Sequence, residues 1–307
     1  MGGGHGHAHG QGDRRLGWAV LVNLALTVVQ IVAGLVAGSL AMIADAVHNL
    51  SDAISLIIAF AARRIARRPA DGAMTFGYAR IEIVAALVNY VTLIVIALYL
   101  AWEGVLRFFE PQPVEGWIVV VVAGFALAID LATAWLTWRL SRESVNIRAA
   151  FLHNLADALG SVAVIVAGTL ILLFGWWVVD PIVTLLISAY ILWHGAVEIL
   201  PVVRMLMLGT PPGLDVAEVR AALLAAEGVE DVHHLHLWQL SERASSLEAH
   251  VVHAPGAGRG LRARLEEMLA QRFGLTHITL QLETAAEAAG HADHGEVDHG
   301  GQVEQRS

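Results

Sequence analysis

The chain contains no cysteine and no lysine among its 307 residues. Without cysteine there is no disulfide framework and no thiolate metal site, so any bound metal needs His, Asp, Glu or backbone oxygen as a ligand. Charged residues are also scarce, at 15% of the chain against about a quarter in an average soluble domain. Together with a hydrophobic fraction of 56%, this shortage predicts an integral membrane protein.

Basic residues form no stripe along the sequence, and the net charge is −9. A nucleic-acid partner is therefore not expected, because nucleic-acid binding depends on clustered positive charge. Histidine, by contrast, is abundant, with 15 copies. The chain thus lacks sulfur ligands but is rich in imidazole.

Long apolar runs dominate the first two thirds of the sequence. They cover Leu16–Ala37, Leu40–Ala62, Ile83–Ala101, Trp117–Trp138, Ala149–Phe174 and Pro181–Leu200. A membrane-spanning helix needs about 20 apolar residues, and the first run is too long for the core of a signal peptide. The very short turns at Gly38-Ser39 and Gly175 predict antiparallel hairpins. The runs therefore predict an all-α membrane domain of six helices, set in a lipid bilayer.

Arginines near the ends of these runs fall almost entirely on one side of the predicted membrane. That side holds Arg14, Arg15, Arg63, Arg64, Arg67, Arg68, Arg80, Arg139, Arg142, Arg148 and Arg204. The other side has Arg107 alone. Because cytoplasmic loops are enriched in basic residues, both termini are predicted to be cytoplasmic.

After residue 208 the pattern changes to that of a small α+β domain. Asp215–Glu227 and Arg259–Phe273 have helical periodicity, whereas Val232–Leu240, Leu247–Val252 and Ile278–Leu282 read as strands. The expected organisation is a His/Gly-rich cytoplasmic tail over 1–13, a six-helix membrane domain over 14–208 and a cytoplasmic α+β domain over 209–283. A polar, acidic, His-containing tail over 284–307 is predicted to be disordered.

One motif occurs twice within the apolar runs. The second run contains His48-Asn-Leu-Ser-Asp52-Ala, and the fifth contains His153-Asn-Leu-Ala-Asp157-Ala. Residues four apart share one face of a helix. Two such faces opposite each other would supply two imidazoles and two carboxylates, a set that suits tetrahedral Zn²⁺. Co²⁺, Cd²⁺ and other divalent ions would compete for the same ligands.

The depths of the two motifs in the membrane are consistent with this arrangement. The nearer member of each pair lies 11 residues, and the farther member 15 residues, from an arginine at the predicted cytoplasmic face, Arg63 or Arg142. At about 1.5 Å per residue the two pairs reach matching depths. If Arg148 marks the interface instead, the second pair lies shallower.

The plainer alternative for these polar residues is hydrogen bonding between helices, which membrane proteins do use. Ionisable groups in a membrane are costly and usually functional, so the duplicated spacing favours a metal site. Asp45 lies three residues before His48, near the same face. It could hydrogen-bond to a metal ligand and hold it in position, or belong to the outward ion route. For Asp130, the charge inside the fourth run, an interhelical hydrogen bond is expected.

At these motifs the chain resembles the cation diffusion facilitator family. The resemblance is carried by Ser39-Leu-Ala-Met-Ile-Ala-Asp45-Ala-Val-His48-Asn-Leu-Ser-Asp52, Phe76-Gly-Tyr-Ala-Arg-Ile-Glu82, Asn146-Ile-Arg-Ala-Ala-Phe-Leu-His153-Asn-Leu-Ala-Asp157, Asp180-Pro-Ile182, His233-His-Leu-His-Leu-Trp238 and Thr279-Leu-Gln-Leu-Glu283. It extends from about Arg15 to Glu283. His-x-x-x-Asp on both helices is similar to the zinc-transporting branch, whereas manganese-type members carry Asp-x-x-x-Asp.

The resemblance implies a ferredoxin-like cytoplasmic domain, a homodimer, and export of a divalent cation in exchange for protons. It also implies a bacterial inner-membrane protein and a second, regulatory Zn²⁺ in the cytoplasmic domain. His233, His250 and Glu283 are the residues that the resemblance favours for that second site. Exposed strand histidines without a metal are the alternative.

Histidine ligands suggest how an ion could be released. A neutral imidazole binds a metal and a protonated one does not, so protons from outside would compete for His48 and His153 and expel the ion. An intramembrane metallohydrolase is disfavoured because no His-Glu-x-x-His motif is present, and no enzyme activity is expected. A metal-responsive sensor or scaffold with little transport remains the alternative function.

Overall fold

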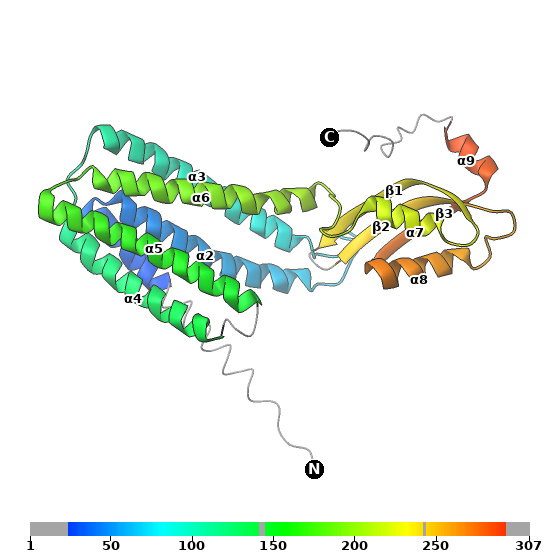
Figure 1. Cartoon of the computed structure of the whole chain (residues 1–307), viewed down its shortest axis with the longest axis horizontal. Helices are drawn as coiled ribbons and strands as arrows, with labels where there is room; N and C mark the ends of the chain where they lie inside the picture. The colour runs from blue at the N-terminus through cyan, green and yellow to red at the C-terminus, as the bar shows by residue number, and fades with distance from the viewer. Residues whose placement is uncertain (1–23, 141–144, 242–243, 293–307) are drawn as a thin grey trace, which may run out of the picture. The chain divides into compact units, whose positions relative to one another are not determined.

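The computed structural model describes residues 24–140, 145–241 and 244–292 (Figure 1). The chain divides into two compact units. The first comprises residues up to 62 together with 85–199, and the second comprises 63–84 together with 200–307. The connection between the second and third predicted helices thus groups with the C-terminal part of the chain.

Helices make up the first unit. They are the helix Leu24–Ala37, α2 (Leu40–Ala66), α3 (Ile81–Phe109), α4 (Gly116–Leu140), α5 (Val145–Phe174) and α6 (Val179–Leu206), whose last turns belong to the second unit. Five of them, α2 to α6, are long and apolar enough to cross a membrane. The helix Leu24–Ala37 is shorter, and the start of the predicted first run lies outside the described residues. The predicted helical membrane bundle is confirmed in this form.

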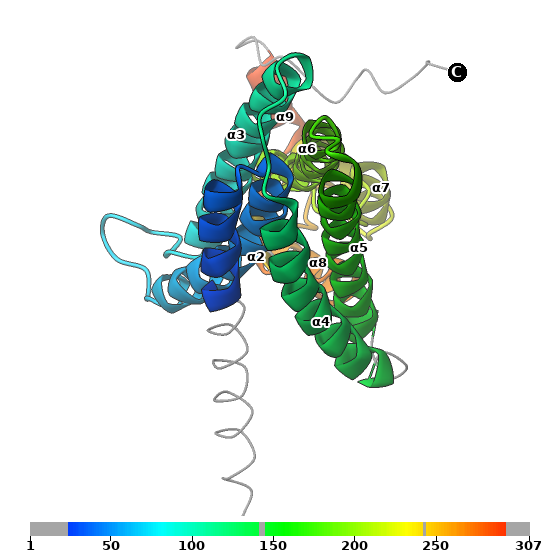
Figure 2. The same ribbon diagram turned by 90° about the vertical axis from the view of Figure 1, so that its left-hand side faces the viewer.

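Small side chains form the contacts between these helices. In Figures 1 and 2 α4 lies beside α5, and α3 packs against α6 through Leu93, Ala97 and Ile191. Buried alanines recur along the contact faces, at Ala37, Ala41, Ala44, Ala46, Ala123, Ala126, Ala134, Ala158 and Ala167. Large apolar side chains such as Phe60, Phe125 and Leu186 point outward. Membrane helices pack in this way because lipid provides no hydrophobic drive for their association, so close backbone approach matters more.

The start of α2 is held by a residue of α6. Asp180 accepts hydrogen bonds from the hydroxyl of Ser39 at 2.5 Å and from the backbone N–H of Leu40 at 2.8 Å. Ser39 in turn accepts from the N–H of Met42 at 3.1 Å. The first N–H groups of a helix have no partner within it, so this buried carboxylate caps α2 from another helix. The turn before it requires Gly38, whose φ is +73° and whose added Cβ would lie 2.9 Å from the carbonyl oxygen of Pro113.

The second unit contains a three-stranded sheet. Its elements are α7 (Val216–Leu224), β1 (Val229–Ser241), β2 (Ala244–His253), α8 (Leu261–Phe273), β3 (His277–Glu283) and α9 (Ala285–Ala292). The strand order is β1-β2-β3, with β1 antiparallel and β3 parallel to β2. The order helix–strand–strand–helix–strand is that of the ferredoxin-like βαββαβ pattern from its first helix onward. The predicted α+β domain is confirmed.

One apolar core joins the helices and sheet of this unit. Leu261, Leu265 and Leu269 follow each other at intervals of four along α8 and are almost fully buried. They meet Val219 and Leu223 of α7 and the inward residues of the strands. The sheet therefore has one covered face, and side chains on the other face remain available for a site.

Candidate metal centres

The structure brings three of the four predicted intramembrane residues together. His48 and Asp52 of α2 and Asp157 of α5 each offer one ligand atom, and these atoms all lie within 4.8 Å of one another. His48 Nε2 is 3.5 Å from Asp157 Oδ1. The two residues of α2 share a face because they are four apart, and α5 places Asp157 against that face.

His153 belongs to the backbone of α5, one turn before Asp157. Its side chain lies outside the part of the chain that the structure describes. Its place in the helix puts it on the same face as Asp157. Its role as the fourth ligand therefore stays a prediction.

The surroundings of this group suit a divalent cation. His48 and Asp157 keep only 8% and 10% of their side-chain surface exposed. The rings of Tyr190 and His48 meet nearly at right angles, with 5.8 Å between their centroids. Two carboxylates and an imidazole in a membrane are costly unless their charge is balanced. A doubly charged cation with N and O ligands provides that balance, and Zn²⁺ accepts such ligands.

Asp45 does not join this group. Its carboxylate accepts a hydrogen bond from Gln30 Nε2 at 3.2 Å and lies 3.5 Å from the Ser161 hydroxyl. Asp130 of α4 accepts from the same hydroxyl at 3.1 Å, which confirms the interhelical hydrogen bond expected for it. Sequence reasoning did not single out Gln30 or Ser161 together with Asp45, because contacts across helices depend on how each helix is rotated.

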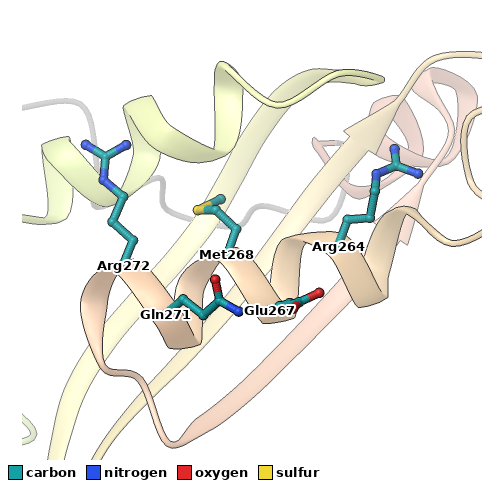
Figure 3. Close-up of a pocket in the computed structure, with 5 residues that line it drawn as sticks. All are labelled: Arg264, Glu267, Met268, Gln271 and Arg272. Carbon is teal, nitrogen blue, oxygen red and sulfur yellow. Dashed lines mark hydrogen bonds between the residues drawn. The ribbon is translucent and has the colours of Figure 1, made fainter.

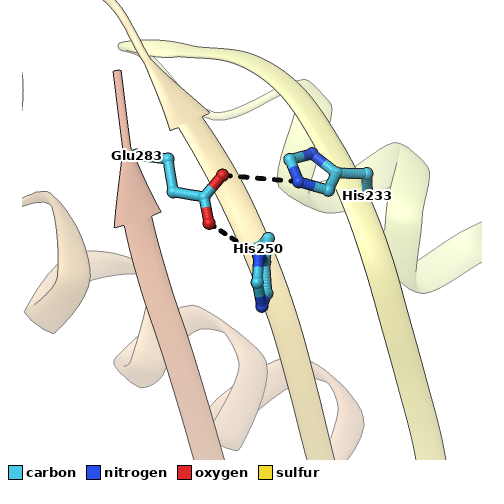
Figure 4. A group of neighbouring side chains, drawn as sticks. All are labelled: His233, His250 and Glu283. Carbon is cyan, nitrogen blue, oxygen red and sulfur yellow. Dashed lines mark ion pairs between the residues drawn. The ribbon is translucent and has the colours of Figure 1, made fainter. Parts of the chain in front are cut away.

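A second group of potential ligands lies on the open face of the sheet (Figure 4). His250 Nδ1 is 2.6 Å from Glu283 Oε1, and His233 Nε2 is 3.4 Å from Glu283 Oε2. His233 of β1 is directly opposite His250 of β2, and Glu283 ends the parallel neighbour β3. The strand register thus places all three predicted residues together.

A distortion of β1 brings further imidazoles close to this group. The register shifts between His233 and His236, and His234 has a φ of +50°, in the left-handed region. The His234 ring lies 5.0 Å from that of His250 and 4.7 Å from that of His236. A non-glycine residue in this conformation is uncommon and often marks a functional position. Glu283 is itself only 2% exposed, so a buried carboxylate faces the two imidazoles of His233 and His250.

A surface depression along α8 is lined by Arg264, Glu267, Met268, Gln271 and Arg272 (Figure 3). One of its arginines, Arg272, already pairs with Glu218 of α7 at 3.2 Å. It contains a single carboxylate and no imidazole. The depression therefore has no ligand set for a metal.

Two family models together match most of the chain. Residues 18–207 match the family model described as the cation efflux transmembrane domain. Residues 211–285 match that of the cation efflux protein cytoplasmic domain. The chain belongs to the cation efflux family. This family is the cation diffusion facilitator family that the motifs resemble.

Two curated relatives are similar to almost the whole chain. The metal cation efflux system protein CzcD of Cupriavidus metallidurans is 38% identical over 301 residues, which cover 95% of this chain and 94% of the relative. The cadmium, cobalt and zinc/H(+)-K(+) antiporter of Bacillus velezensis is 34% identical over 292 residues, covering 93% of each. A solved metal-bound C-terminal domain of the Cupriavidus metallidurans CzcD transporter is 39% identical, covers 23% of this chain and 99% of that one, and has a TM-score of 0.22.

The two family matches follow the division of the chain into apolar helices and a small α+β domain. The transmembrane match covers the helices α2 to α6, and the cytoplasmic match covers the sheet with α7 and α8. The relatives named here are transporters and not enzymes. The chain is an integral membrane protein of a cation efflux family.

Proposed function

We propose that this chain exports Zn²⁺ from the cytoplasm in exchange for protons. His48, Asp52, His153 and Asp157 bind the transported ion, and Co²⁺ and Cd²⁺ compete with it. The observation that carries this proposal is the meeting of His48, Asp52 and Asp157 across two helices. The Bacillus velezensis relative is named as an antiporter of cadmium, cobalt and zinc with protons and potassium, which supports both the ion class and the exchange.

The exchange follows from ligand chemistry. Imidazole binds a metal only when neutral, so a proton that reaches His48 from the outer side weakens the hold on the ion. The membrane helices must then expose the group alternately to the two sides, as repacking of helices around a central site allows. Small residues such as Ala44 and Ala46, fully buried in α2, permit close sliding contacts.

Both termini and the α+β unit face the cytoplasm, as the arginine distribution predicts, in a bacterial inner membrane. The protein acts as a homodimer. A regulatory Zn²⁺ binds at His233, His250 and Glu283, whose side chains already lie together. Boundaries near residues 13, 208 and 283 separate the tails and the two domains.

Zinc flux into proteoliposomes tests the transport site. The native protein is compared with Asp157→Ala and with a control, Asp231→Ala, which removes an exposed carboxylate paired with Arg220. We expect flux in the native protein and the control and none in Asp157→Ala. Equal flux in all three would place the ion path elsewhere.

A sensor or scaffold is the second candidate, favoured by the separate ligand group on the sheet. Zinc binding without flux in the native protein would support the sensor. Flux that is indifferent to an imposed pH gradient would disprove the proton exchange while leaving zinc transport in place.

A further inference from the structure

Four helices contribute one side chain each to a polar network beside the ion ligands. Gln30 comes from the helix Leu24–Ala37, Asp45 from α2, Asp130 from α4 and Ser161 from α5. Gln30 and Ser161 have no exposed surface, Asp45 keeps 4% and Asp130 9%. The proposed transport site uses none of them as a ligand. Buried polar groups in a membrane need a reason to be there.

The polar network has one donor hydrogen too few for its hydrogen bonds if both carboxylates are ionised. The Ser161 hydroxyl lies 3.1 Å from Asp130 Oδ2 and 3.5 Å from Asp45 Oδ2. A hydroxyl has one hydrogen and so donates to only one of two carboxylates. The second contact is satisfied only when a carboxyl group carries a proton and donates it to Ser161 Oγ.

Gln30, at the other end of the polar network, also lacks a hydrogen-bond donor for one of its atoms. Its Nε2 donates to Asp45 Oδ2 at 3.2 Å, while its Oε1 is buried and has no hydrogen-bond partner among the described residues. The two ends of an amide are interchangeable by rotation. Gln30 can therefore donate to an ionised Asp45 or, after a flip, accept from a protonated one.

The charges around Asp45 favour a proton rather than a second metal. The groups that face it are Asp130 of α4, Asp157 of α5 and His48 on its own helix. Asp157 is also the charged group that faces Asp130. Among the described residues, the charged groups that face Asp45 and Asp130 include no arginine. Two carboxylates without a fixed cation in a membrane are stabilised by sharing one proton, as carboxylate pairs in other proteins do.

Helix α5 leaves space for this carboxylate. A Cβ at Gly160 would lie 2.8 Å from Asp45 Oδ1. A larger residue at this position would require the Asp45 side chain to shift. The glycine therefore allows Asp45 to approach α5 closely in its present position.

We propose that Asp45 and Asp130, bridged by Ser161, hold a proton that is exchanged for the metal. This inference rests on the proposed exchange of Zn²⁺ for protons. Metal and proton then occupy separate positions close enough to repel each other. A divalent cation at His48 and Asp157 drives the proton off the carboxylate pair, and departure of the cation lets it return. Such coupling is reciprocal, because each ligand changes the affinity of the other by the same factor.

The number of protons released per zinc bound tests this inference. It is measured in the detergent-solubilised full-length protein with a pH indicator, alongside calorimetric zinc binding. Asp45→Asn and Asp130→Asn keep the shape of the side chain but cannot take up the proton. We expect each variant to bind zinc and to release about one proton fewer per zinc than the native protein.

Asp180→Asn is the matched control, since it changes a carboxylate that is equally buried but caps α2. Its proton count should equal that of the native protein. An unchanged count in Asp45→Asn and Asp130→Asn would overturn the inference and leave the protons on the histidines. Loss of zinc binding in these variants would also overturn it, because Asp45 would then be a support of the ligands. An equal fall in the proton count of the Asp180→Asn control would overturn it as well. If the native protein shows no pH-dependent flux, the proposed exchange itself fails, which is a separate result.

Discussion

At the scale of single residues, we expect the histidines of the duplicated motif to decide which ion is preferred. Imidazole favours zinc, whereas carboxylates and other oxygen ligands suit harder cations such as manganese. His48→Asp replaces one nitrogen by oxygen and gives α2 the spacing Asp-x-x-x-Asp. We expect the ratio of zinc to manganese flux to fall by about tenfold or more.

Competition between the two ions in proteoliposomes measures this ratio. The matched control is His277→Asp on β3, where the native imidazole packs against Phe76 and not against a ligand group. The control should keep the native preference. A zinc preference that survives His48→Asp would mean that His48 does not contact the ion.

Helical periodicity is what made the intramembrane group predictable from sequence. His48 and Asp52 had to share a face of α2, and the repeat of the motif indicated that α5 would face it with Asp157. The polar network through Asp45 could not be predicted from helical periodicity, because it requires the rotation of three other helices to be known. Ser161 in particular has no sequence signal that separates it from the other small residues of α5.

At the scale of elements, the cap on α2 is a stability feature. Asp180→Ala removes the acceptor of the Ser39 hydroxyl and the Leu40 N–H, and leaves both donors buried. Each buried donor without a partner costs about 1–3 kcal/mol. We therefore expect a clear fall in the thermal unfolding midpoint of the detergent-solubilised protein.

Asp231→Ala provides the comparison for this experiment. Asp231 is 57% exposed and pairs with Arg220 at 3.1 Å. Exposed ion pairs contribute about 0–1 kcal/mol, so this variant should unfold close to the native temperature. Equal midpoints for the two variants would show that the Asp180 cap does not hold α2.

The connection between α2 and α3 has its own hydrogen-bonded turn, outside the membrane-spanning helices. The Tyr78 hydroxyl donates to Asp71 Oδ2 at 2.6 Å, and the N–H groups of Ala73 and Met74 donate to Asp71 Oδ1. The bond from Tyr78, with those two N–H groups, lowers the pKa of Asp71 below 3.8. The bond to Asp71 raises the pKa of Tyr78 above 10.0.

These shifts define the pH range over which the turn is held. The contribution of Asp71 is present above its ordinary pKa of 3.8 and is lost as the pH falls through its lowered value. The contribution of Tyr78 is present below 10.0 and is lost as the pH rises through its raised pKa. Asp71→Asn should bring the pKa of Tyr78 back toward 10.0. The pKa of Tyr78 is measured from phenolate absorbance, after the signal of Tyr78→Phe has been subtracted to isolate this tyrosine. Asp231→Asn is the control. An unchanged pKa of Tyr78 in Asp71→Asn would contradict the bond.

Element boundaries show where the sequence reasoning worked and where it did not. The strands and α8 were predictable from alternation and helical spacing, since each has a buried face in the same core. The helix α9 occupies the first part of the segment expected to be a disordered tail. Its signal was local: the Thr284 N–H donates to Glu287 Oε2 at 2.7 Å, and the Glu287 N–H donates back to the Thr284 hydroxyl at 3.4 Å. This is a capping box, and alanines follow it.

At the scale of the whole molecule, the two ligand groups lie in different units, so we expect each to act without the other. The intramembrane group carries the proposed transport, and the group at His233, His250 and Glu283 carries the proposed regulatory zinc. A ligand that binds only the folded state stabilises it by about 2.7 kcal/mol at a hundredfold excess over its dissociation constant. Zinc should therefore raise the unfolding midpoint through the group on the sheet even where transport is blocked.

Two variants test this separation in opposite directions. Asp157→Ala should lose zinc flux and keep the zinc-dependent stabilisation of the α+β unit. Glu283→Gln should lose that stabilisation, because a buried carboxylate between two imidazoles is replaced by a neutral amide, and should retain flux through the membrane group.

The control is Glu248→Gln on the same strand as His250, where the carboxylate is exposed and belongs to neither group. Thermal unfolding with zinc and with a chelator, beside flux in proteoliposomes, gives both readouts. If Glu283→Gln abolished flux as completely as Asp157→Ala, the sheet group would be an obligatory part of the transport route and not a separate regulatory centre.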